Sequence, residues 1–263
     1  MEKVSVITVC YNAGKTIKNT IESVLSQNYA DYEYVVVDGA SKDDTLEIVQ
    51  SCSEQFAQKG IPMTVVSEPD KGIYDAMNKG IDLATGDWII FMNADDSFYH
   101  ADALKNVFCN DLRGYDVVYG DCVRLDGQGA YPMKANPPET LPKQMPFMHQ
   151  AVFARSELCK RYKFDLNYKL CADYDFFFTV HASGCKFKHV GATVCNYSIR
   201  GISGKALIEA QKEVIAIKKK HEKQFPITGK DRMQWVVDGM KMRIKMLVPE
   251  SFLSKLRQKK YRR

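Results

Sequence analysis

Short apolar runs alternate with helical patterns along the first hundred residues. Four runs of strand length are apolar or β-branched: Val4–Val9, Tyr34–Val37, Thr64–Val66 and Trp88–Met92. After the first run, apolar residues recur three and four positions apart at Ile17, Ile21 and Val24. A later pattern, Ile73–Ala84, has an apolar face whose small residues permit close packing. The series predicts an α/β fold with a mostly parallel sheet and right-handed crossovers.

A polar or acidic cluster follows each of these runs. The clusters are Tyr11 with Asn12, Asp38 with Gly39, Glu68–Lys71 and Asn93–Asp96. Because the carboxyl ends of parallel strands lie on one edge of a sheet, we expect the clusters to converge on one crevice. Any one of them alone fits an ordinary polar turn. Four in series favour a binding site.

The cluster after the last run has the chemistry of a cation site. Asn93, Asp95 and Asp96 offer hard oxygen ligands, which suit Mg²⁺ or Mn²⁺, and such an ion suits a pyrophosphate. No G-x-G-x-x-G follows the first run, and the chain has no P-loop motif. Without a glycine-rich cradle, a bound diphosphate needs a metal and side chains to offset its charge.

Length and composition indicate a globular body. The 263 residues are 45% hydrophobic, enough for a sizeable core. Val4–Val9 is too short for a signal peptide, and no apolar run is long enough to span a bilayer. Eight cysteines are scattered without a C-x-x-C pair, which favours reduced thiols in a cytoplasmic protein over disulfides or zinc.

The net charge of +5 is divided unevenly. Residues 205–263 carry 17 Lys and Arg against 6 Asp and Glu, which is +11, whereas residues 1–204 carry −6. An acidic body with a basic C-terminal arm predicts that the arm meets an anionic surface.

Together these segments resemble family 2 glycosyltransferases. The resemblance rests on residues 4–12, 23–27, 37–45, 68–80 and 86–96, which occur in the family's order and extend over about residues 2–200. It is greatest to bacterial enzymes that build capsule, O-antigen and exopolysaccharide. The family implies a GT-A fold, a nucleotide-sugar donor such as a UDP-sugar, a divalent metal and inversion at the anomeric carbon.

The resemblance also assigns the donor pocket. Tyr11, next to Asn12, would stack on the base, and Asp38 would hydrogen-bond the base edge or the ribose. Asp70 and Lys71 would close the nucleotide pocket.

A second set of residues corresponds to the family's metal motif. Asn93-Ala94-Asp95 occupies the D-x-D position, with Asp95 as the metal ligand. Asn93 replaces the first acid, yet its amide oxygen still accepts from a ribose hydroxyl. Asp96 is a second candidate ligand or an acceptor contact, and the alternative is that it caps the following turn.

The resemblance places the general base in the second half of the chain. Residues 165–178 resemble an acidic motif that opens a helix, and Asp173 matches the base. Asp175, two residues on, is expected to make a structural pair. His149 and Gln150 match an element ahead of the base and are expected to contact the donor phosphate or the acceptor. For a lone histidine a structural role is the alternative.

The C-terminal arm has an amphipathic pattern. The apolar positions of its helix form one stripe: Met233, Val236, Val237, Met240, Ile244 and Leu247. Basic residues crowd the segment after Pro249. This pattern fits a helix at a membrane interface, and the alternative is a helix packed on the body with a solvated basic tail.

The sequence therefore predicts a GT-A catalytic domain over residues 1–204, with a nucleotide-binding half (1–100) and an acceptor-binding half (101–204), and a basic helical extension over 205–263. The predicted activity is metal-dependent, inverting hexosyl transfer to a lipid-linked or oligosaccharide acceptor in surface polysaccharide synthesis, at the inner face of the cell membrane. A non-catalytic nucleotide-sugar-binding relative is the first alternative. A basic-tailed nucleic-acid-binding protein is the second, and the acidic body and the absence of a reading motif oppose it.

Overall fold

The structure is a computed structural model that describes residues 2–127, 129–198 and 204–247. The chain divides into two compact units, Met1–Arg200 and Gly201–Arg263. Each unit is described below by itself.

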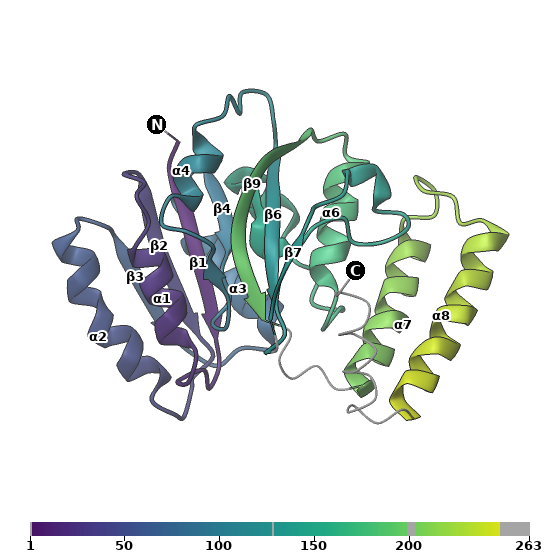
Figure 1. Cartoon of the computed structure of the whole chain (residues 1–263), viewed down its shortest axis with the longest axis horizontal. Coiled ribbons are helices and arrows are strands. Elements are labelled where there is room, and N and C mark those ends of the chain that lie inside the picture. The colour runs from purple at the N-terminus through teal and green to yellow at the C-terminus, as the bar shows by residue number, and fades with distance from the viewer. Residues whose placement is uncertain (1, 128, 199–203, 248–263) are drawn as a thin grey trace. The chain divides into compact units, whose positions relative to one another are not determined.

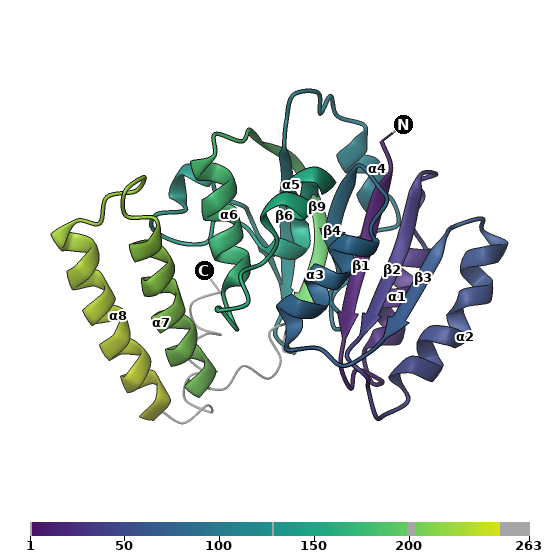
Figure 2. The ribbon, with the colours of Figure 1, turned by 180° about the vertical axis from the view of Figure 1, so that it is seen from behind.

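Four parallel strands form the first half of the sheet in the first unit. They are β1 Val4–Cys10, β2 Tyr32–Asp38, β3 Met63–Ser67 and β4 Trp88–Phe91. Their order is β3-β2-β1-β4, with parallel pairing throughout. The helices α1 Ile17–Leu25, α2 Thr45–Gln58 and α3 Ile73–Leu83 connect them. α1 and α2 cover one face and α3 the other (Figure 1, Figure 2). The predicted α/β alternation is confirmed.

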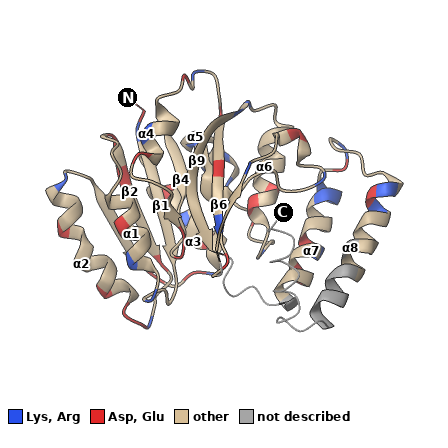
Figure 3. Ribbon diagram, in the orientation of Figure 1, with Lys and Arg blue, Asp and Glu red and all other residues tan. Residues whose placement is uncertain are grey.

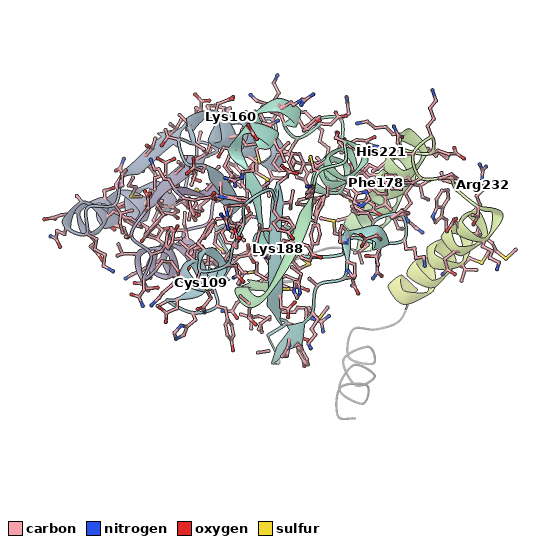
Figure 4. All side chains as sticks on the ribbon, turned by 90° about the horizontal axis from the view of Figure 1, so that it is seen from above. Cys109, Lys160, Phe178, Lys188, His221 and Arg232 are labelled. Atoms are coloured by element: carbon pink, nitrogen blue, oxygen red, sulfur yellow. The ribbon has the colours of Figure 1, made fainter. Side chains whose placement is uncertain are left out.

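The second half extends this sheet with mixed pairing. Its strands are β5 Ser97–Phe98, β6 Val117–Leu125, β7 Ala130–Met133, β8 Val152–Arg155 and β9 Phe187–Ser198. β8 is antiparallel to β4 and β6, whereas β6 and β9 run parallel. The helical segments are α4 Ala103–Phe108, η1 Pro138–Thr140, η2 His149–Ala151, α5 Ser156–Tyr162 and α6 Ala172–Ala182. Cys109, after α4, and Lys160, on α5, lie on opposite sides of the sheet (Figure 4).

Both faces of the central strands are buried, so the helices must pack closely on them. Every residue of β1, β2 and β4 is buried. A Cβ at Gly80 of α3 would lie 2.6 Å from Cγ2 of Ile7, so glycine permits the close approach of this helix. Ile73, which the helical pattern placed on the buried face, is instead 45% exposed. It is the first residue of α3 and lies at the carboxyl edge of the sheet.

The strand order reverses at β1, and this positions the site. β2 and β3 extend the sheet on one side of β1, and β4 lies on the other. The hydroxyl of Thr8 donates to the carbonyl oxygen of Met92 at 2.7 Å, and the amide of Met92 donates to Ile7 O at 2.9 Å. These bonds hold the carboxyl ends of β1 and β4 together, where open α/β sheets bind ligands.

The second unit contains the helices α7 Gly204–Lys220 and α8 Gly229–Leu247. The Thr228 amide donates to Asp231 Oδ2 at 2.8 Å and the Asp231 amide to Thr228 Oγ1 at 3.3 Å, a reciprocal cap that starts α8. The Gln211 amide nitrogen donates to Trp235 O at 3.2 Å and links the two helices. Among the residues described, no helix is both long and apolar enough to cross a membrane.

Candidate active site

The predicted base-binding residues lie at the carboxyl ends of β1, β2 and β3. The ring of Tyr11 is 60% exposed. A Cβ added to Gly39 would lie 2.4 Å from Asp70 Oδ2 and 3.3 Å from Cδ2 of Tyr11. The Tyr11 ring and the Asp70 carboxylate therefore flank the bare backbone of Gly39, and a side chain at residue 39 would collide with them.

Asp38 lies beneath this surface and is fully buried. Its Oδ2 accepts from the Ser41 amide at 3.0 Å and from the Ser67 hydroxyl at 2.6 Å, and its Oδ1 accepts from the Ser41 hydroxyl. Burial and the Asp38 charge raise the pKa of the neighbouring Cys10 thiol. Asp38 thus joins the ends of the strands, and its predicted contact with the base edge or ribose stays a prediction.

Two turns present the remaining pocket residues. Asn12, with φ 48°, accepts from the Lys42 amide through Oδ1 at 2.9 Å and so shapes the loop after β2. Asp70 Oδ1 accepts from the Gly72 amide at 2.8 Å, and the φ of 121° at Gly72 favours glycine. Lys71, between them, is exposed at the start of α3.

The two acids of the segment after β4, Asp95 and Asp96, lie in different environments. Asp95 is exposed at the end of β4, and partial removal of water raises the pKa of its carboxyl. Asp96 is only 2% exposed, and burial together with the charge of Asp95 raises its pKa to about 6. Asp96 accepts from Gln150 Nε2 at 2.8 Å and from the Ser198 amide at 3.0 Å. Asp95 is therefore available to a ligand, whereas Asp96 ties η2 to the end of β9.

Three side chains connect this segment to the predicted base, and a fourth contacts the base from α3. His149 Nε2 lies 3.1 Å from Asn93 Nδ2, and its Nδ1 lies 3.3 Å from Asp173 Oδ2. The hydroxyl of Tyr74 lies 2.9 Å from Asp173 Oδ1. These residues come from the end of β4, from η2, from the first turn of α6 and from the first turn of α3. The fold thus brings Asn93, His149 and Asp173 together, as one site requires.

Asp173 and His149 shift each other's pKa, each favouring the charged form of the other. Burial opposes the ionised carboxylate, but hydrogen bonds from His149 and Tyr74 outweigh it and lower the pKa of Asp173. Burial also opposes the imidazolium, but the hydrogen bond and charge of Asp173 raise the pKa of His149. A small cavity of about 20 Å³ lies behind His149, with apolar walls that include Phe91 and Phe164. His149 therefore has an apolar cavity on one side, and both side chains of the pair keep partial exposure, 20% for His149 and 18% for Asp173.

The donor set fits a divalent cation that a substrate helps to hold. In the described part of the chain, no three His, Cys, Asp or Glu side chains form a metal cluster. Mg²⁺ is typically bound through one or two carboxylates together with substrate phosphates and water, and the exposed Asp95 meets that need. Asn93 Oδ1 is buried without a hydrogen-bond partner among the described residues, so it can accept from a ligand hydroxyl or water.

Two features of the site were not predicted from the sequence. Tyr74 was expected only as part of a helix, and its contact with Asp173 spans 99 residues of sequence. Ser41 and Ser67 were not expected to bind the Asp38 carboxylate. Asp175, expected to be structural, is 4% exposed.

Comparison with known proteins finds similarity to glycosyltransferases, both in a family profile and in a single relative. The profile of "Glycosyl transferase family 2" matches residues 5–171. A "PGL/p-HBAD biosynthesis glycosyltransferase" of Mycobacterium tuberculosis is 34% identical over 179 residues, which cover 65% of this chain and 67% of that protein.

Two solved structures share the fold. TarS 1-349 of S. aureus in complex with UDP aligns with a TM-score of 0.66 and 19% identity over 90% of this chain and 70% of that one. A mannosyltransferase from Pyrobaculum calidifontis in complex with GDP-Man and Mn²⁺ aligns with a TM-score of 0.63 and 21% identity, over 82% and 64% of the two chains.

Proposed function

The chain belongs to glycosyltransferase family 2, and from this premise we propose an inverting, metal-dependent enzyme that transfers a hexose from a UDP-sugar to a lipid-linked or oligosaccharide acceptor. The observation that carries the proposal is the contact chain Asn93–His149–Asp173. It joins the segment that would meet the diphosphate to the carboxylate that would meet the acceptor. A single displacement needs both within one crevice.

The donor would bind over β1, β2 and β3. Tyr11 is proposed to stack on the base beside Gly39, Asp38 to meet the base edge or ribose, and Asp70 and Lys71 to close the pocket. Asn93 is proposed to accept from a ribose hydroxyl through its unpartnered Oδ1. Mn²⁺ or Mg²⁺ held by Asp95 and the diphosphate would offset the charge of the leaving group.

The acceptor would react beside Asp173. The attacking hydroxyl oxygen forms a bond to the anomeric carbon as the bond from that carbon to the phosphate oxygen breaks, and its proton passes to the Asp173 carboxylate. Because this displacement is a single step without a covalent intermediate, the configuration at the anomeric carbon is inverted. His149, hydrogen-bonded to Oδ2, would orient the carboxylate and contact the donor phosphate or the acceptor.

A donor panel tests this activity. Purified protein is mixed with UDP-, GDP- and dTDP-sugars and Mn²⁺, and both thermal stabilisation and nucleotide release are measured. We expect a UDP-sugar to raise the melting temperature most and to release UDP when an acceptor is present. Stabilisation without any nucleotide release across a broad acceptor panel would favour the non-catalytic alternative.

The second unit supports attachment to an anionic membrane. Four described apolar side chains of α8 form one exposed stripe: Met233 (70%), Val236 (57%), Val237 (38%) and Met240 (59%). Basic residues lie at the end of α7 and the start of α8 (Figure 3). Ile244, Leu247 and the basic segment after Pro249 lie outside the described side chains. An exposed apolar stripe beside basic residues suits an interfacial helix, which would bring the enzyme to a lipid-linked acceptor at the inner membrane face.

A further inference from the structure

Tyr74 has one hydroxyl proton and two acceptors within reach. Its oxygen lies 2.9 Å from Asp173 Oδ1 and 3.0 Å from the carbonyl oxygen of Leu170. A phenol donates a single hydrogen bond, so only one of the two contacts is a donated bond at any moment. Burial and the charge of Asp173 raise the pKa of this phenol well above its usual value, so Tyr74 keeps its proton and cannot serve as the base itself.

The ring of Tyr74 is held so that only its hydroxyl hydrogen is free to turn. The side chain is 7% exposed and packs against the ring of Phe164, with centroids 5.3 Å apart. Asn78 on α3 makes two reciprocal bonds to the backbone of Phe164, at 2.9 Å to its oxygen and 2.8 Å from its amide. Rotation about the phenolic C–O bond therefore exchanges the two acceptors without moving heavy atoms.

We propose that Tyr74 is a positioning residue whose proton is donated to Asp173 Oδ1 while that carboxylate is ionised, and turns to Leu170 O once Asp173 has taken the acceptor's proton. The inference rests on the proposed role of Asp173 as the base. A hydrogen bond to an ionised carboxylate is about twice as strong as one to a neutral acceptor, so the ionised state holds the proton. After proton transfer, the Leu170 carbonyl receives it, and no buried donor is left unpaired.

One of the groups that face Asp173, His149, can report on the hydrogen bond from Tyr74. His149 faces it from η2, Tyr74 from α3 and the Tyr174 amide from its own helix, while Cys171 and the buried Asp175 lie on the same stretch of chain. The charge of Asp96 also raises the pKa of His149. The hydrogen bond and charge of Asp173 raise the pKa of His149, so the titration of His149 responds to how much of the Asp173 charge is compensated.

NMR titration of His149 in the full-length protein tests the inference. In Tyr74→Phe, Asp173 loses one donor and binds the imidazolium more strongly, so we expect the pKa of His149 to rise by about 0.5–1 unit. We expect kcat to fall about ten- to a hundredfold while the affinity for UDP stays within about twofold. The matched control is Tyr32→Phe, which also loses a buried hydroxyl bonded to a backbone carbonyl, that of Val24 at 2.9 Å. The His149 signal is assigned with His149→Gln.

A second variant keeps the inference testable if Tyr74→Phe folds poorly. Incorporation of 3,5-difluorotyrosine at residue 74 keeps the hydroxyl and makes it a stronger donor, so the pKa of His149 should fall. An unchanged His149 titration in both Tyr74 variants, or a kcat of Tyr74→Phe equal to that of Tyr32→Phe, would overturn the inference. If Asp173→Asn is inactive while the Tyr74 variants resemble the wild type, only this inference fails. If Asp173→Asn is active, the proposed base fails instead.

Discussion

His149 Nδ1 lies 3.3 Å from Asp173 Oδ2, and its Nε2 reaches Asn93 on the segment that precedes Asp95. One imidazole ring therefore separates the residues that would hold the donor's diphosphate from the residue that would deprotonate the acceptor. An Asn in the first position of the D-x-D-like motif suits this arrangement, because a carboxylate there would place a second negative charge beside His149.

The proposed metal ligand, Asp95, gives the first prediction. Asp95→Asn removes the exposed anionic oxygen that a hard cation prefers, so we expect turnover to be lost and UDP-sugar binding to become insensitive to Mn²⁺ and Mg²⁺. Calorimetric titration with and without the ion measures this. Asp102→Asn, a half-exposed acid at the start of α4, is the control. Wild-type activity that survives a strong chelator would contradict the metal-dependent mechanism.

Gly39 gives the second prediction. In Gly39→Ala, the new methyl group would meet Asp70 Oδ2 at 2.4 Å, so Asp70 or the Tyr11 ring must shift. We expect affinity for UDP to weaken about tenfold, about 1.4 kcal/mol, with little change in melting temperature. Gly229→Ala is the control, because a methyl group there meets nothing within 4 Å. Equal UDP affinity in the two variants would exclude the surface around Gly39 as the base-binding site.

Acid stability gives the third prediction. Burial opposes the charge of Glu33, but hydrogen bonds from Lys3, Ser5 and Thr85 outweigh it and lower its pKa from 4.5 to about 2. A carboxyl with a lowered folded-state pKa stabilises the fold above its unfolded pKa, and this contribution is lost as pH falls through the folded value. Glu33→Gln should therefore reduce the free energy of unfolding by about 2–3 kcal/mol at pH 7.

Urea unfolding across pH measures this difference. It should be constant above about pH 5 and shrink as pH falls toward 2, because the wild-type carboxylate becomes protonated there. Glu22→Gln, whose carboxylate is exposed and only loosely paired with Lys18, is the control. A difference independent of pH would mean that Glu33 acts through packing rather than charge.

The second unit gives the fourth prediction. Residues 241–263 carry nine Lys and Arg against Glu250, a net +8. If half of that charge engages an anionic leaflet, the attraction is about 4 kcal/mol, nearly a thousandfold in partitioning. Truncation before Asp231 should release the protein from anionic vesicles and spare activity on a short soluble acceptor. High salt should weaken binding of the full chain, leaving the part due to apolar insertion.

Two double variants separate the contribution of the apolar stripe from that of the basic residues. Val236→Asp with Met240→Asp should reduce vesicle binding about tenfold or more, whereas two Asp substitutions at the exposed Lys219 and Lys230 should produce a loss that disappears at high salt. If the full chain ignores anionic vesicles at low salt, or the truncated protein unfolds, the membrane role is wrong. A concentration-dependent dimer that Val236→Asp abolishes would assign the stripe to a second copy of the chain.

The parallel half of the fold was predictable because buried parallel strands are continuous apolar runs. Val4–Cys10 and Trp88–Phe91 are such runs, and their polar ends mark the crevice. In the second half, β6 and β8 also contain short buried runs, but their pairing is mixed rather than parallel. In β9 exposed and half-buried residues are interspersed, and a register shift against β6 near Asp121 disrupts its alternation.

Side-chain partners were less predictable than positions. The motif order indicates that His149 and Asp173 share a site, but the contact of Tyr74 with Asp173 depends on how the first turns of α3 and α6 meet, and no local sequence pattern predicts that. The same holds for Asp38, whose position at the end of β2 was evident but whose burial under Ser41 and Ser67 was not.

The most direct measurement compares turnover and donor binding in Asp173→Asn and Asp175→Asn. Asp173→Asn keeps size and hydrogen bonding but cannot accept the proton, so kcat should fall about 10²–10⁴-fold while UDP-sugar affinity and melting temperature stay near wild type. Asp175→Asn, if folded, should keep most of its turnover. An active Asp173→Asn beside a folded and inactive Asp175→Asn would contradict the account and move the base to Asp175.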